Sequence, residues 1–364
     1  MMTVFYRFLF CFSVLVSLFS FTGNSQTRIA PYRPGVTSEG ISYFLPITRL
    51  HIVVRAQKEH YQPGEYAQWA ERFLEVKNVA QEEGDTWTIK SIEVYPYGEA
   101  DHNRAYTIKL DNRSSAPLVS LAPDGVLLGI NTRVKPLATL ERPSVTADSK
   151  VTKLPATFKS QEIIRATSLA AKAEVTAQEI YDIRENRTLL AKGQADFQPK
   201  DGQQLKLMLD HLNEQESALT SIFLGTTARE NHVFTFDFTP TKDVEALELF
   251  RFSKHLGLLE HGDLAGDPVR ISVTNQNTLP IIDEAALSKR EKGQRDLRYC
   301  NPSNARVQIF TTHQKFFDTS LPFAQFGRVE HLGGKLFDRK FDILVTLSPS
   351  TGALERVDQE TKTY

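Results

Sequence analysis

The stretch "TRLHIVVRA", residues 48–56, decides the fold class. Its apolar residues Leu50, Ile52 and Val54 alternate with polar ones such as Arg55, so the apolar side chains fall on one face of an extended chain. A period of two is the spacing of a β-strand with one buried face. We therefore predict a β-strand here and place it in a β-rich domain.

The neighbouring residues complete this first domain. "PGEYAQWAERFLEV" changes to helical spacing, with Pro63 just before its first turn. Alternation returns in "TWTIKSIEVYPY" and "AYTIKL". Pro123, Asp124 and Gly125 then supply the turn residues of a β-hairpin between two apolar runs. We predict that residues 43–140 form a β-rich domain with one helix.

Two helices are expected next. Residues 141–165 contain prolines and few aromatic residues, which indicates a linker. Residues 166–225 follow with helical spacing and a Gly- and Pro-containing break near Gly193, which predicts a helical hairpin. Two capping-box patterns mark the expected helix starts. They are Thr176 with Glu179 and Asp201 with Gln204.

The last part of the chain, residues 226–364, alternates again. In "VFTFDFTP", Phe234, Phe236 and Phe238 share one face. The sequence thus predicts an α+β fold, with two mainly antiparallel β domains and an αα-hairpin between them.

The first residues have the pattern of a secretory signal peptide. Arg7 is followed by an apolar run of about fourteen residues, shorter than the roughly 20 that a membrane-spanning helix needs. We expect residues 1–25 to be removed, leaving Gln26 first, and residues 26–42 to form an N-terminal arm. An uncleaved membrane anchor is the alternative. The expected location is the periplasm or the outer membrane, with no transmembrane segment after cleavage.

Composition narrows the possible partners. A formal net charge of −1 gives no basic excess for binding nucleic acid. Removal of Cys11 with the signal peptide leaves Cys300 alone, so no intrachain disulfide can form. Cys300 could be a nucleophile or an intermolecular cross-link, but free cysteine is among the most buried residue types, which favours a buried apolar role.

The predicted first helix contains "IYDIRENRTLLAKGQ", residues 180–194, and places Arg187 where an apolar residue is expected. Glu216 does the same on the second helix. The two could line a charged pocket or form a structural ion pair, and we favour the ion pair. Counting outward from the loop sets Arg187 opposite about residue 208, so their contact is not assured. Arg184 is expected on the solvated side.

Two loops carry candidate site residues. "EHGDLAGDP" holds His261, Asp263 and Asp267, which could bind a divalent cation or act as an acid and base. "YGEADHNRAY" offers Asp101 and His102. In both loops the competing interpretation is turn formation. The sequence contains no HExxH, CxxC, P-loop or G-x-S-x-G motif, so we predict no metal site and no cofactor.

Several blocks together resemble a family of exported proteins of Bacteroidetes, described as domain of unknown function 4831. They are "YFLPITRLHIVV", "QPGEYAQWAERFLEVKNV", "IYDIRENRTLLAKGQ", "LNEQESALTSIFLGTT", "LFRFSKHLGLL", "PFAQFGRV" and "SPSTGALERV". The blocks run in order over nearly the whole mature chain. The resemblance implies a signal peptide and an envelope location, and it transfers no activity, cofactor or catalytic residue.

Three functions remain as hypotheses. The first is a non-enzymatic binding or assembly module whose partner is another envelope protein or a glycan. The second is a secreted hydrolase acting on a glycan or peptide through carboxylates such as Asp263 or Asp101. The third is a surface adhesin or fimbria-like element, in which the arm, residues 26–42, supplies a donor strand.

Overall fold

The computed structural model describes residues 28–31, 40–109, 118–134, 158–195, 201–281, 296–333 and 341–361. All sheets in these ranges are built from antiparallel strand pairs, and the helices gather into one separate group, which confirms the predicted α+β class. The predicted signal peptide lies outside the described residues, and so do residues 141–157 of the predicted linker.

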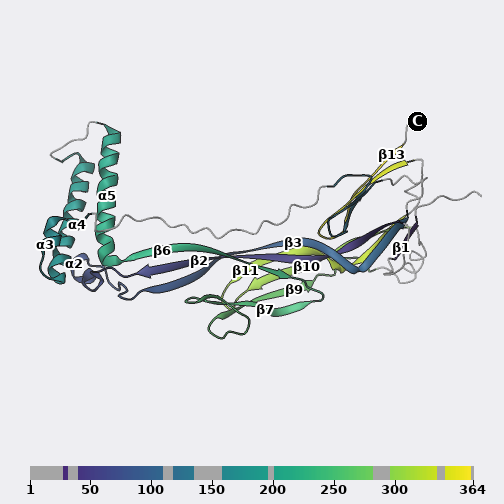
Figure 1. The fold of residues 1–364 in the computed structure, drawn as a ribbon, viewed down its shortest axis with the longest axis horizontal. Coiled ribbons are helices and arrows are strands. Elements are labelled where there is room, and N and C mark those ends of the chain that lie inside the picture. The colour runs from purple at the N-terminus through teal and green to yellow at the C-terminus, as the bar shows by residue number, and fades with distance from the viewer. Residues whose placement is uncertain are drawn as a thin grey trace, which may run out of the picture.

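Two long antiparallel strands form the spine of the molecule. They are β2 (Ile41–Gln62) and β3 (Gly84–Lys109), and they pair from Ile41 opposite Ile108 to Tyr61 opposite Gly84. Figure 1 shows the pair running along the long axis, with helices at one end and a small sheet at the other. The predicted strand at residues 48–56 is the middle of β2.

A β-sandwich occupies the middle of this spine. Leu50, Ile52 and Val54 of β2 are fully buried against residues of the facing sheet such as Ile271. Burying each such side chain contributes about 1.5–3 kcal/mol. One layer has the order β1 (Arg28–Pro31), β3, β2, β6 (Thr226–Phe238). The other has β11 (Lys315–Leu332), β10 (Leu297–Phe310), β9 (Asp267–Asn275), β7 (Val244–Ser253), β8 (Gly257–Leu259).

A small third sheet packs on one end of the spine. Its core combines Tyr43 and Leu45 of β2 with residues such as Leu127 and Val345. The predicted turn at residues 123–125 is present, and Gly125 adopts a φ of +89° there. The strand order is β13 (Leu354–Thr361), β12 (Phe341–Leu347), β5 (Leu127–Ile130), β4 (Val119–Leu121).

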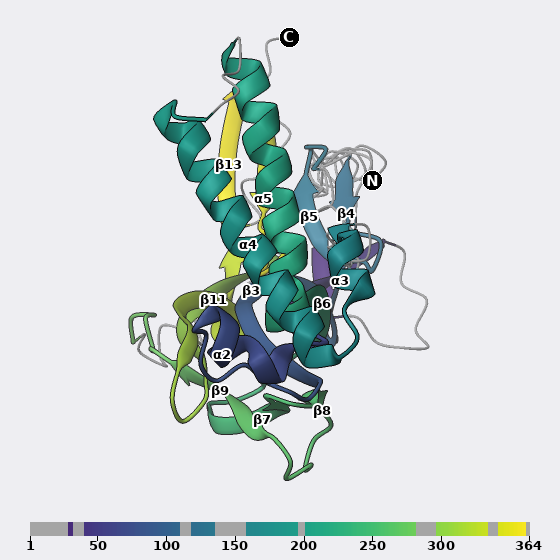
Figure 2. The same cartoon turned by 90° about the vertical axis from the view of Figure 1, so that its left-hand side faces the viewer.

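Helices cover the opposite end of the spine (Figure 2). Their core contains Tyr66, Ile180, Leu219 and Phe223, all fully buried. Tyr66 lies four residues beyond Gln62, the last residue of β2, so the chain enters this core soon after leaving the spine. The helices are η1 (Ala67–Trp69), α2 (Ala70–Leu74), α3 (Gln161–Arg165), α4 (Leu169–Lys192) and α5 (Gly202–Leu224).

One predicted helix start is wrong and the other is confirmed. α4 begins at Leu169, where Ser168 is the N-cap, so Thr176 lies inside the helix. There the Thr176 hydroxyl donates to the Lys172 carbonyl, a common arrangement for a buried threonine within a helix. Asp201 does cap α5, because its side chain accepts a hydrogen bond from the Gln204 amide.

Strands from the two predicted β-rich ranges pair with each other. β6 pairs with β2, and β12 pairs with β5. The helical hairpin, which we define as α4 and α5, stands between the two ranges along the chain but at one end of the spine in space (Figure 1). The domain limits given in the sequence analysis stay a prediction.

Candidate functional site

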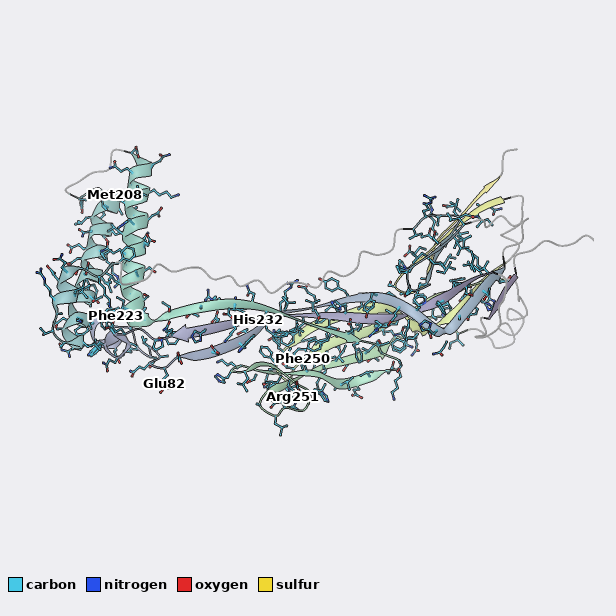
Figure 3. All side chains as sticks on the ribbon, viewed as in Figure 1. Glu82, Met208, Phe223, His232, Phe250 and Arg251 are labelled. Carbon is cyan, nitrogen blue, oxygen red and sulfur yellow. The ribbon has the colours of Figure 1, made fainter. Side chains whose placement is uncertain are left out.

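The far half of the helical hairpin carries an apolar groove of about 650 Å³, which we call the distal groove. None of the described residues 184–195 and 201–217 is buried, although leucines recur there. Leu207 is 72% exposed. Figure 3 shows Met208 near the far end of the hairpin and Phe223 at its packed base. The groove is lined by Asn186, Leu189, Leu190, Gln194, Ala195, Leu207, Met208, His211 and Leu212.

An ion-pair cluster closes the hairpin below the distal groove. Arg184 Nε donates to Glu216 Oε1 over 2.6 Å, and Arg187 Nη1 contacts Glu216 Oε2. Arg187 also donates to Asn213 Oδ1 at 2.9 Å. The Glu216 side chain is only 15% exposed, so both of its oxygens are occupied by guanidinium groups in a half-buried setting.

Two expectations about this cluster need correction. Arg184 does not simply face solvent, because it shares Glu216 with Arg187. Arg187 does not lie opposite residue 208 either. α5 rises well beyond α4 in both views (Figures 1 and 2), so the residues opposite Arg187 are further along α5, at Asn213 and Glu216.

The structure places His261, Asp263 and Asp267 around the β8–β9 connection. The His261 ring is 71% exposed, and its Nδ1 lies 3.3 Å from Glu248 Oε1. Asp263 Oδ1 accepts from the Ala265 amide at 2.9 Å, the geometry of a side chain that stabilises its own turn. Asp267 is the first residue of β9.

Asp101 and His102 do not lie in a loop between two strands as predicted, because β3 continues through them; they are also in a different sheet from the β8–β9 connection. Asp101 Oδ2 accepts from Arg104 Nε at 2.7 Å. The His102 ring lies edge-on to Phe44, with centroids 4.9 Å apart. The two groups of predicted site residues therefore contact their own neighbours and are not brought together.

Cys300 is fully buried on β10. Its Sγ donates to the Ala324 carbonyl at 3.2 Å. Burial raises the pKa of the thiol to about 11, so the thiolate is scarce near neutral pH. This environment is that of a structural cysteine.

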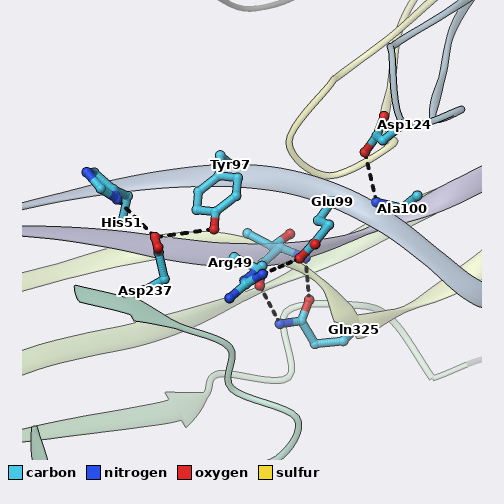
Figure 4. A network of polar contacts seen from close by, with 9 residues as sticks. Arg49, His51, Tyr97, Glu99, Ala100, Asp124, Asp237 and Gln325 are labelled. Carbon is cyan, nitrogen blue, oxygen red and sulfur yellow. Dashed lines mark hydrogen bonds and ion pairs between the residues drawn. The ribbon is translucent and has the colours of Figure 1, made fainter. Parts of the chain in front are cut away.

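A network of polar side chains on the outer face of the spine was not predicted from the sequence (Figure 4). His51 Nδ1 lies 2.9 Å from Asp237 Oδ1, and the Tyr97 hydroxyl donates to the same oxygen at 3.3 Å. Burial, the largest single influence, would raise the pKa of Asp237, but the hydrogen bonds from His51 and Tyr97 and the nearby basic groups His51 and Arg49 together outweigh it, so the pKa is lowered. Arg49 pairs with Glu99 beside them. Only the polar half of the β2 alternation hinted at this network.

Directly beneath this network, Thr48 joins three segments. Its hydroxyl donates to the Ser350 carbonyl and accepts from the Ala324 amide, both at 3.0 Å. The Gln325 side chain bonds both backbone groups of Thr48 and also donates to the Pro240 carbonyl. These contacts fix the small sheet on the sandwich.

Comparison with known proteins gives one assignment. The family described as a domain of unknown function (DUF4831) matches residues 39–355. The chain belongs to the DUF4831 family. No curated protein and no solved structure gives a significant match to this chain.

The DUF4831 region contains the spine, the sandwich and the helical hairpin, so the distal groove is part of it, whereas β1 lies outside. In the described part of this region, no three His, Cys, Asp or Glu side chains gather into a possible metal site. Within the same residues, no helix has the length and apolar character needed to cross a bilayer.

Proposed function

We propose that the protein is an exported, non-enzymatic binding module of the cell envelope that holds an amphipathic helix of a partner protein in the distal groove. The observation that carries this proposal is the groove itself. Leucine-sized side chains line it from two neighbouring helices, while the residues around them stay partly exposed.

The spacing of the lining residues suits a helical partner. On α5 the groove is lined by positions 207, 208, 211 and 212, and on α4 by positions 186, 189 and 190. These are i, i+3 and i+4 steps, so two parallel walls of side chains run along the groove. A third helix with an apolar stripe fits such walls as it does in a helical bundle. Met208 adds an adaptable surface.

The placement of the groove also supports binding. The helical hairpin stands at the end of the spine and projects away from the sheets (Figure 1). A partner could reach Leu207 without disturbing the sandwich. The predicted signal peptide supports export, and Gln26 is the expected first residue of the mature chain.

The two alternative functions have less support. The carboxylates considered for a hydrolase, Asp263 and Asp101, are engaged by a turn amide and by Arg104. The arm considered for an adhesin contributes β1, which pairs with β3 of its own chain.

Site-specific photo-cross-linking in the native host tests the proposal. A photoreactive phenylalanine analogue at Leu207 should give a discrete protein adduct, whose mapped peptide lies in an amphipathic helix. The same analogue at Leu264, which is 86% exposed between β8 and β9, is the matched control and should give none. Absence of an adduct at Leu207, or an identical adduct at both positions, overturns the proposal.

Mapping the mature N-terminus by mass spectrometry tests export separately. A chain that begins at Gln26 supports cleavage of the signal peptide. A chain that retains residues 1–25 contradicts it.

A further inference from the structure

A second candidate interface lies on β6 and is independent of the distal groove. β6 has 13 residues and pairs with β2 on one side, from Leu50 opposite Phe238 to Gln62 opposite Thr226. Among the described residues, no strand pairs with its other side. About half of the N–H and C=O groups of an edge strand point outward, where they can pair with another strand.

The charges on the outer face of β6 are arranged symmetrically. Arg229 and Asp237 point to this face, and Val233 lies midway between them. Each charge already has a partner on β2. Arg229 Nε lies 2.9 Å from Glu59 Oε1, and Asp237 Oδ1 lies 2.9 Å from His51 Nδ1.

We propose that β6 of a second copy of this chain pairs antiparallel with β6, about a two-fold axis at Val233. In that register Arg229 lies opposite Asp237 of the second copy, and Asp237 lies opposite Arg229 of the second copy. Each cross-sheet row then reads Glu59, Arg229, Asp237, His51, so acidic and basic side chains alternate along it. Directly opposed charges of unlike sign stabilise an antiparallel pair, and a two-fold axis produces the row twice.

The charge pattern selects this register. A shift by one residue would turn the charged face toward the core side of the partner strand. A shift by two sets Arg229 opposite Thr235 or beyond the end of β6. An unrelated extended peptide could use the same backbone groups, whereas β6 of a second copy also offers the matching charge at both ends.

The inner face of β6 fits the same pairing. Phe234, Phe236 and Phe238 pack on the sandwich core but are only half-buried. In the proposed register, Phe234 lies opposite His232 of the second copy. Within one chain these two rings already stack, with centroids 6.3 Å apart and planes 10° apart. A paired strand would extend the sheet and cover the edge of the core.

Analytical ultracentrifugation of the mature full-length chain tests this inference. Wild type should be a dimer. Arg229→Glu and Asp237→Lys should each weaken dimerisation by about tenfold or more, because two attractive pairs become repulsive. An equimolar mixture of these two variants should form a heterodimer, since every opposed pair is again of unlike sign. Circular dichroism should show that each variant is folded.

A third variant tests the position of the two-fold axis, and a fourth is its matched control. Val233→Lys places two ammonium groups at the axis and should give a monomer. The control, Val357→Lys on the edge strand β13 of the small sheet, should leave the dimer intact. A monomeric wild type, or a dimer that Leu207→Glu disrupts and the β6 variants do not, overturns the inference. Neither outcome bears on photo-cross-linking at the distal groove.

Discussion

Thr48 and Ser350 are 302 positions apart in the chain, yet the Thr48 hydroxyl donates to the Ser350 carbonyl at 3.0 Å. The same hydroxyl accepts from the Ala324 amide. One fully buried hydroxyl therefore satisfies backbone groups from β11 and from the β12–β13 turn. The small sheet and the sandwich depend on this residue for their relative position.

Replacing Thr48 by Val should destabilise the protein. Valine has nearly the same shape, so the change removes the hydroxyl and leaves a buried amide and a buried carbonyl unpaired. We expect a loss of about 1–3 kcal/mol in the free energy of unfolding, measured by urea titration. Thr274→Val on the exposed face of β9 is the control and should change little. Equal effects of both changes would contradict the role given to Thr48.

Gly98 is required where β3 passes under the β12–β13 turn. A methyl group at Gly98 would lie 2.1 Å from the Pro349 carbonyl oxygen, so the turn would have to move. Gly98→Ala should cost about 1–3 kcal/mol. Gly84→Ala, at the start of the same strand, meets no atom within 4 Å and is the matched control. Thermal unfolding of both variants checks the difference. A Gly98→Ala protein as stable as wild type would contradict the close packing.

Glu216 should matter for the far half of the helical hairpin only. Glu216→Gln weakens the bonds from Arg184 and Arg187, and we expect a local loss of about 1 kcal/mol. Hydrogen exchange of residues 184–192 and 205–216 should then be about fivefold faster, while the sandwich strands are unchanged. Glu185→Gln, on the exposed side of α4, is the control. Faster exchange throughout the protein would show that the effect is not local.

Because of Cys300, the free energy of unfolding should fall as the pH rises into the alkaline range. Its pKa rises from 9.0 in a free thiol to about 11 in the folded protein, so the unfolded chain loses its proton first. The stabilising effect is complete below pH 9 and is lost as pH rises to 11. The loss is about 2–3 kcal/mol. Cys300→Ala should reduce the slope of unfolding free energy against pH over this interval. An unchanged slope would mean that the thiol is not buried as described.

The local parts of the fold were readable from sequence, and the pairings were not. The alternation around Leu50 and the turn at Gly125 depend on neighbouring residues, so strands and a β-hairpin could be predicted. The pairing of β6 with β2 joins segments about 180 positions apart, and no local pattern encodes it. Single-residue alternation cannot identify a partner strand at that separation.

The candidate site was missed for a related reason. The leucines of α5 have the spacing of a buried stripe, and only Leu219 at the base is fully covered. Whether Leu212 is buried depends on how far α5 extends beyond α4. The same offset between the two helices decides which residue of α5 contacts Arg187. The offset is set by how the helices pack, and the residue pattern of each helix alone does not predict it.

The spine has a mechanical consequence. A pull between the helical end and the small sheet acts lengthwise on β2 and β3, whereas their hydrogen bonds run crosswise. Because both strands run the whole distance between these ends, two paired backbones share the pull, and the crosswise hydrogen bonds hold them side by side. Paired, extended backbones leave little slack along this axis, so the distance between the helical end and the small sheet should change little under a lengthwise pull.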